Sequence, residues 1–176
     1  MPSHESDPLL VTLRFDEPSF RRFQSERRQH FPPARNIVPA HLSLFHKLPG
    51  EEIGAIVADL REATKEQRGA IPLAITGLRF LGYGTAYTIA SPALDVLRAD
   101  LARRWSSWLT PQDAQRFSAH VTIQNKAPAG EAKALHAALN AAFVPFAAEA
   151  TGLLLWHYRG GPWEPAGAFP FPEPEA

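Results

Sequence analysis

Two short segments of the chain carry the residue types that acid–base chemistry needs. Residues 41–44 have the sequence HLSL, and residues 120–123 have the sequence HVTI. In each segment one apolar residue separates a histidine from a hydroxyl residue, and another apolar residue follows. Histidine exchanges a proton near neutral pH, and a hydroxyl group both donates and accepts hydrogen bonds. These segments are therefore the first candidates for a reactive site.

The spacing inside each segment has a direct consequence if both segments are β-strands. Side chains of a strand alternate between its two faces, so His41 and Ser43 would point to one side. His120 and Thr122 would do the same in the second segment. The apolar residues between them would point into a core. Each strand would then offer one imidazole and one hydroxyl group to the same side of a sheet.

Two imidazoles that meet in one cleft suit the chemistry of a phosphodiester. One takes a proton from the attacking water or hydroxyl group, and the other gives a proton to the departing oxygen. The hydroxyl groups of Ser43 and Thr122 would bond the phosphate oxygens. We expect no metal ion and no cofactor, since an imidazolium already balances the developing negative charge. His41 and His46 have opposite strand parity and no carboxylate neighbours, which argues against a shared metal site.

Distances along the chain indicate an internal repeat built around the two motifs. His120 follows His41 by 79 residues, and each half reads strand, helix, histidine strand, helix, strand. We predict an α+β fold with two lobes, made of duplicated strand–helix–strand units about a pseudo-two-fold axis. Antiparallel sheets would line a central cleft. Without such a repeat, two ordinary strands that each carry a half-buried histidine would explain the motifs equally well.

The remaining elements follow from apolar periodicity and from turn residues. Helices are expected after Asp16, from Ile53 to near Gly69, after Ser91 and from about Gly130. Strands are expected at residues 9–15, 40–48, 71–81, 85–90, 117–125, 146–158 and 164–171. We predict one two-lobed domain over residues 9–171, a disordered N-terminal tail over residues 1–8, and a C-terminal tail over residues 172–176.

Composition limits the classes of function. The 176 residues include 18 basic and 18 acidic residues and no cysteine. A balanced charge argues against a protein that holds long nucleic acid mainly through the phosphate backbone, but leaves a short or terminal substrate open. The lack of cysteine excludes disulfides, thiolate zinc sites and cysteine nucleophiles. With no secretory signal and no long apolar run, we expect a cytoplasmic protein.

With these motifs the chain resembles the 2H phosphoesterases, and among them the bacterial and archaeal 2',5' RNA ligase-like proteins. Two H-x-[S/T]-x motifs define that family, and the resemblance in lobed order covers about residues 9–171. Three further segments look like those of its smaller bacterial members: LGYGTAY at 81–87, QNK at 124–126 and WHYRGGPW at 156–163. Ser43 replaces the usual threonine and keeps the hydroxyl group. The sequence HKLPG at 46–50 departs from the usual Phe-Leu-Gly, which bears on substrate fit rather than on the chemistry.

The resemblance implies a phosphodiesterase that acts on RNA ends with His41, Ser43, His120 and Thr122 as its catalytic residues. Members of the family cleave 2',3'-cyclic phosphates or 2',5' linkages, and some join tRNA halves in reverse. By the same analogy His120 activates the nucleophile and His41 protonates the leaving oxygen. We expect a monomer with no membrane partner. Two alternatives are a cyclic phosphodiesterase for a small nucleotide, such as ADP-ribose cyclic phosphate, and a non-catalytic protein that binds RNA ends.

Four further residues are candidate substrate contacts, each with a plainer interpretation. Phe45 shares the strand parity of the first histidine, and Tyr87 lies on a strand expected beside the cleft, where an aromatic ring could stack on a base. Core packing is the more common use of such rings and is the alternative for both. Gln124 and Lys126 continue the parity of the second motif, or simply form a solvated strand end. Four arginines crowd the first helix as a solvated face or an RNA-backbone patch: Arg21, Arg22, Arg27 and Arg28.

Overall fold

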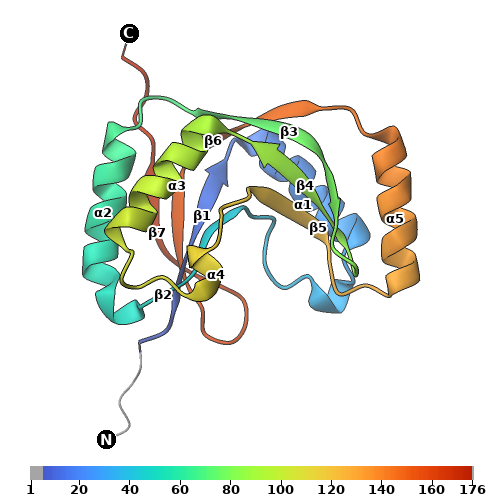
Figure 1. Cartoon of the computed structure of the whole chain (residues 1–176), viewed down its shortest axis with the longest axis horizontal. Coiled ribbons are helices and arrows are strands. Elements are labelled where there is room, and N and C mark those ends of the chain that lie inside the picture. Colours follow the sequence, from blue (N-terminus) through green and yellow to red (C-terminus); the bar gives the residue numbers. More distant parts are fainter. Residues whose placement is uncertain (1–5, 176) are drawn as a thin grey trace, which may run out of the picture.

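The computed structural model describes residues 6–175 and confirms the α+β fold (Figure 1). The strands are β1 (Leu9–Phe15), β2 (Ser43–Leu48), β3 (Ile71–Phe80), β4 (Thr85–Ala90), β5 (His120–Gln124), β6 (Phe146–His157) and β7 (Glu164–Pro170). The helices are α1 (Glu17–His30), α2 (Ile53–Glu66), α3 (Pro92–Arg104), α4 (Pro111–Ala114) and α5 (Ala129–Ala142). Two short 3-10 turns lie at Pro33–Arg35 and Gly50–Glu52.

Within these residues the strands form one antiparallel sheet in the order β2-β1-β6-β3-β4-β5, with β7 also paired to β6. The long strand β6 joins the two halves of the sheet. Its first residues pair with β3, and its later residues pair with β1 on one side and β7 on the other. The two lobes expected from the repeat therefore share a continuous sheet. Its outermost strands, β2 and β5, carry the two histidine motifs.

The order of the strands is symmetric about the β6–β3 pair, which agrees with the predicted repeat. In the first half β1 pairs with β2, and in the second half β4 pairs with β5. The last strand of each repeat crosses to the other half, because β3 pairs with β4 and β6 pairs with β1. The crossing ties the two halves together, so neither half forms its sheet alone.

Helices cover the two halves of the sheet separately. Helices α2 and α3 pack against each other, whereas α1 packs on β5 and α5 packs on β3 and β4. Figure 1 shows α2 and α3 together at one end of the molecule and α5 at the other. The starts of α1 and α3 follow from the sequence: Asp16 and Ser91 cap them, and each has a proline in its first turn.

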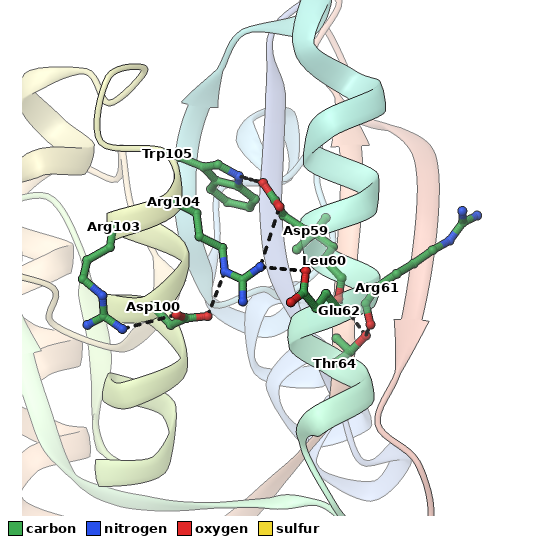
Figure 2. Close-up of polar contacts among 9 residues, drawn as sticks. All are labelled: Asp59, Leu60, Arg61, Glu62, Thr64, Asp100, Arg103, Arg104 and Trp105. Atoms are coloured by element: carbon green, nitrogen blue, oxygen red, sulfur yellow. Dashed lines mark hydrogen bonds and ion pairs between the residues drawn. The ribbon is translucent and has the colours of Figure 1, made fainter.

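A polar cluster fixes α3 against α2 (Figure 2). Arg104 of α3 forms ion pairs with Asp59 and Glu62 of α2 and with Asp100 of its own helix. Trp105 donates a hydrogen bond from its indole nitrogen to Asp59 at 2.8 Å. Its ring is fully buried and packs edge-on against Phe45 of β2, with ring centroids 4.9 Å apart. The α2–α3 contact thus supports the strand that carries the first motif.

The element boundaries differ from the predicted ones mainly around the two motifs. Strand β2 begins at Ser43, so His41 lies two residues before it, and β5 begins at His120 itself. The short helix α4 was not predicted; a four-residue helix has no periodicity to reveal it. Trp108 lies in the turn after α3 and is half-buried.

Both chain ends make contacts close to the predicted limits of the domain. The carbonyl of Pro8 accepts a hydrogen bond from the backbone of Tyr158, and the carbonyl of Pro172 accepts one from Gly69. Asp7 forms an ion pair with Arg159. The predicted tail over residues 1–8 otherwise falls largely outside the described residues. No helix between residues 6 and 175 is both long and apolar enough to cross a membrane.

Candidate active site

The two motif histidines are held in the same way in both halves. The Nδ1 atom of His41 lies 2.8 Å from the carbonyl oxygen of Pro39, and that of His120 lies 2.8 Å from the carbonyl oxygen of Ser118. Each carbonyl belongs to the residue two positions before its histidine. A carbonyl oxygen only accepts, so the contact assigns a hydrogen to Nδ1 in both rings. The exchangeable position is therefore Nε2 in both cases.

Helix α1 positions the irregular segment that leads to His41. Gln24 accepts a hydrogen bond from the backbone of Ala40 at 2.7 Å. Three residues later on the same helix, Arg27 donates from Nε to the side chain of Asn36 at 3.1 Å. The segment has no regular secondary structure beyond one short turn, so these side chains replace the backbone ladder that a strand would supply.

Arg27 also reaches the second motif and thereby joins the two. Its Nη1 donates to the carbonyl oxygen of Thr122 at 2.9 Å. The side chain is almost completely buried, and burial lowers its pKa to about 10, so it stays charged at neutral pH. A fixed positive charge therefore lies beside both motifs. The sequence offered Arg27 only as one of four helix arginines, and the clustering gave no sign that this one is buried.

The surroundings of His41 favour its neutral form. Burial is the main cause that lowers its pKa to about 4, and the positive charges of Arg27, His120 and His46 act in the same direction, against the opposing hydrogen bond to Pro39. The interaction with His120 means that the two motif histidines lie close enough to influence each other. The half-buried ring of His41 also packs against Trp163, with ring centroids 4.6 Å apart. An anionic phosphate beside His41 would raise its pKa again.

Ser43 and His120 line one cavity of about 260 Å³. Ser43 comes from β2 and His120 from β5, which are the two ends of the sheet order. The sheet therefore curls until its edge strands face each other, and a residue from each motif borders the same space. The rest of this cavity is lined by His46 and by charged side chains such as Arg79.

A second cavity, of about 310 Å³, lies against His41 and has a different character. Its walls are mainly apolar and include Phe20, Trp156 and Trp163. The indole nitrogen of Trp156 donates to Thr12 at 2.9 Å, so that ring presents no free polar atom. His120 does not border this cavity. The apolar cavity thus lies beside His41, and the charged cavity lies beside His120.

Each motif ends in a β-bulge, and the two bulges occupy equivalent positions. Along β2, Ser43 pairs with Thr12 and Phe45 pairs with Val11, so Leu44 is an extra residue. The pairing of β5 with β4 skips Ile123 in the same way, between Thr122 and Gln124. A bulge reverses the alternation of side chains beyond it. Residues that follow the motifs therefore point to the opposite face from the one expected of a regular strand.

The bulges make two of the predicted substrate contacts wrong. Phe45 is fully buried against Trp105 in the core. Gln124 is also buried, and its amide donates to the carbonyl of His30 at the end of α1, at 3.2 Å. Strict alternation from a motif histidine places both residues on the cleft face, but an extra residue interrupts that alternation in each strand.

The other two predicted contacts have different outcomes. Tyr87 packs in the core against Phe23 and Phe146, and its hydroxyl donates to Glu26 at 2.6 Å. Burial and this contact raise its pKa to about 12. The proposed stacking of Tyr87 on a base is therefore wrong, and the core interpretation holds. Lys126 is exposed beyond the end of β5, with φ at 58° in a tight turn, and its contact with substrate stays a prediction.

Sequence reasoning missed a third histidine in the site. Beyond the first bulge, His46 returns to the cleft face and lines the same cavity as Ser43 and His120. Its Nδ1 lies 2.9 Å from the carboxylate of Asp113, a fully buried residue of α4. The expected parity of His46 was wrong because of the bulge. Its carboxylate partner comes from an element that the sequence did not reveal.

Comparison with known proteins decides the family. A family model described as the 2'-5' RNA ligase superfamily matches residues 15–162, a range that includes both histidine motifs. The chain belongs to this superfamily. No curated protein matches the chain at a significant level.

Solved structures of similar proteins show the same fold. TT0787 of Thermus thermophilus superposes with a TM-score of 0.63 at 15% identity, over 96% of this chain and 100% of that one. LigT of E. coli, complexed with 3'-AMP, gives 0.55 at 16% identity, over 96% and 99%. A structure described as a phosphoesterase gives 0.53 at 18% identity, over 94% and 99%. Superfamily membership supports a phosphodiesterase-type function for the chain.

Proposed function

We propose that the protein is a metal-independent phosphodiesterase that acts on RNA ends by two-histidine acid–base catalysis. Its reaction would be hydrolysis of a terminal 2',3'-cyclic phosphate to a 2'-phosphate, or the cleavage and formation of a 2',5' linkage. The observation that carries the proposal is the matched pair of Nδ1–carbonyl contacts at His41 and His120. Two imidazoles with the same tautomer and free Nε2 atoms form an acid–base pair.

In hydrolysis, Nε2 of one histidine takes a proton from water as the water oxygen attacks phosphorus. The bond from phosphorus to the 3' oxygen breaks, and Nε2–H of the other histidine protonates that oxygen. The product keeps its phosphate on the 2' oxygen. Ser43 and Thr122 hold the non-bridging oxygens through their hydroxyl groups, and the buried charge of Arg27 favours an anion between the motifs.

The lowered pKa of His41 bears on the division of roles between the histidines. A proton acceptor must be neutral before the reaction, and the lowered pKa of His41 makes it neutral at pH 7. This favours His41 as the acceptor in the free protein, which is the reverse of the assignment implied by the family resemblance. Ligation runs the same steps backwards, so the roles exchange with the direction of the reaction.

Relatives support a nucleotide substrate. LigT of E. coli has been crystallised with 3'-AMP, with phosphate and with NADP⁺. These ligands share a phosphate group, two of them on a nucleotide. A small nucleotide with a cyclic phosphate, such as ADP-ribose cyclic phosphate, is the second candidate substrate. The charged cavity beside His120 suits such a small nucleotide as well as it suits RNA, because both ligands carry additional phosphate.

The decisive experiment is hydrolysis of a short RNA that ends in a 2',3'-cyclic phosphate, in excess EDTA. The wild type should turn over, and His41→Ala and His120→Ala should each lose at least about 10²-fold in kcat. His136→Ala is the matched control, since His136 lies on α5, contacts Thr85 and lines neither cavity beside the motifs. Unchanged turnover in both motif variants would refute the mechanism. Retained RNA-end binding without turnover in the wild type would favour the non-catalytic alternative.

A further inference from the structure

The cavity beside Ser43 and His120 contains more positive charge than one phosphate needs. We propose that His46, Arg79 and Arg116 form a second anion subsite in this cavity, which binds another phosphate group of the same substrate. The inference rests on the proposed function and narrows its substrate class. The second phosphate belongs either to the next linkage of an RNA chain or to the diphosphate of a small nucleotide.

The charge of the cavity lining is strongly one-sided. Three arginines line it, Arg79, Arg98 and Arg116, together with His46. The single acidic residue of the lining is Asp113, and three N–H groups already bind its carboxylate: the backbone and ring of His46 and the backbone of Lys47. The whole chain has no net charge, so this excess is a local feature. Such a lining attracts anions.

Asp113 gives His46 a fixed orientation. Burial alone would raise the pKa of Asp113, but the hydrogen bonds from His46 and Lys47 hold it below its usual value, so the group is a carboxylate. A carboxylate only accepts, and Nδ1 of His46 is therefore the donor in their 2.9 Å contact. The side chain of His46 is 38% exposed, and its Nε2 remains for a ligand in the cavity.

The three arginines differ in their contacts. Arg98 is buried and committed to the protein, because it donates to the carbonyl oxygens of Leu44 and Asp113. Arg79 donates to the hydroxyl of Ser118, whose carbonyl holds the ring of His120. Arg116 is exposed and forms no ion pair with any residue between 6 and 175. Its guanidinium is thus the one best placed to adapt to a ligand.

The proximity of this subsite to the motifs limits what it can bind. His46, Ser43 and His120 border one space of about 260 Å³. A phosphate held at Ser43 and His120 would therefore have the second anion as a near neighbour. Adjacent phosphates of a nucleotide chain and the two halves of a diphosphate both meet this requirement. A nucleoside with a single cyclic phosphate leaves the subsite unused.

Equilibrium binding tests the subsite without relying on turnover. The probes are adenosine 3'-phosphate and adenosine 3',5'-bisphosphate, measured by calorimetry at low salt. We expect the wild type to bind the bisphosphate about tenfold or more tightly, as a charge-assisted hydrogen bond would give. In His46→Gln and in Arg116→Gln the ratio of the two Kd values should fall towards one.

Arg61→Gln is the matched control for the loss of a surface arginine. Arg61 lies on α2 and points away from α3 into open space (Figure 2), outside the cavity. The Arg61→Gln variant should show the same ratio of the two Kd values as the wild type. Equal affinity of the wild type for both probes, or an unchanged ratio in both cavity variants, would overturn the subsite. Failure of the RNA hydrolysis assay with a normal Kd ratio would instead count against the proposed reaction alone.

Two larger probes identify the source of the second phosphate. A dinucleotide that ends in a 3'-phosphate carries it in an RNA linkage, and ADP-ribose 1''-phosphate carries it in a diphosphate. The probe that carries its second phosphate as the natural substrate does should lose more affinity in His46→Gln than the other probe. Asp113→Asn tests the positioning of His46: it should lower the same Kd ratio while circular dichroism shows an intact fold. A variant with an intact fold and a wild-type ratio would exclude that positioning role.

Discussion

At the scale of single residues, the chemistry depends on which nitrogen of each imidazole carries its hydrogen. Backbone carbonyls two residues earlier settle this for His41 and His120 alike. The sequence predicted the residues of both motifs. It did not predict that burial and neighbouring charges would lower the pKa of His41, since Arg27, His120 and Trp163 are brought beside it only by the fold.

The pKa of His41 predicts how stability depends on pH. The folded value of about 4 lies below the unfolded value near 6.5, so between these pH values the unfolded chain binds more protons. The contribution of neutral His41 is therefore complete above pH ~6.5 and declines as the pH falls towards 4, by up to about 3 kcal/mol. Urea unfolding at pH 7.5 and 4.5 should show a smaller loss for His41→Gln than for the wild type. Equal losses would contradict the lowered pKa.

Trp163 offers a second test at the same scale. Removing its ring in Trp163→Ala uncovers the imidazole of His41, so the pKa of His41 should move back towards its ordinary value near 6.5. NMR titration of the imidazole protons measures the change directly. Trp108→Ala is the control, because Trp108 lies in the turn after α3 and lines neither cavity that borders a motif histidine. If the pKa of His41 is unchanged in Trp163→Ala, groups other than Trp163 cause its lowering.

At the scale of elements, alternation predicted the motifs and failed immediately beyond them. The strands were assigned from apolar residues, and a bulge leaves that composition unchanged. The extra residues Leu44 and Ile123 are themselves apolar and buried. Only pairing with β1 and β4 determines which residue is skipped, and this pairing joins distant parts of the chain. Phe45, Gln124 and His46 could therefore not be placed from sequence, whereas the helices with capped starts could.

Helix α1 is the element that connects the motifs, and Arg27 tests this role. Arg27→Gln removes the hydrogen bond to the carbonyl of Thr122 and leaves that part of the site without its buried charge. We expect a loss of about 2–4 kcal/mol in the free energy of unfolding, since buried acceptors lose a charged donor. The exposed neighbour Arg28 is the control, and Arg28→Gln should change stability by less than about 0.5 kcal/mol. Similar values for the two variants in urea unfolding would refute the assignment.

At the scale of the whole molecule, one strand holds both halves of the site together. Because β6 pairs with β1, β3 and β7, the positions of the edge strands β2 and β5 are fixed through it. The sequence predicted the duplication of the halves from the motif spacing. It did not reveal that the last strand of each repeat crosses to the other half, because a strand pattern contains no information about its partner.

Gly152 marks the place where β6 can be tested. A Cβ added there would lie 2.6 Å from the carbonyl oxygen of Phe169 in β7, and a backbone atom cannot move away cheaply. Gly152→Ala should therefore lower the free energy of unfolding by about 2–4 kcal/mol through overpacking. Gly54→Ala is the matched control: its Cβ meets nothing within 4 Å on α2, and alanine should stabilise that helix by about 0.5–1 kcal/mol. If β6 joins the halves, Gly152→Ala should still unfold in one cooperative transition, at a lower melting temperature. Near-ultraviolet dichroism and nucleotide binding should be lost together in that transition. Separate transitions for the two signals would show that the halves fold independently.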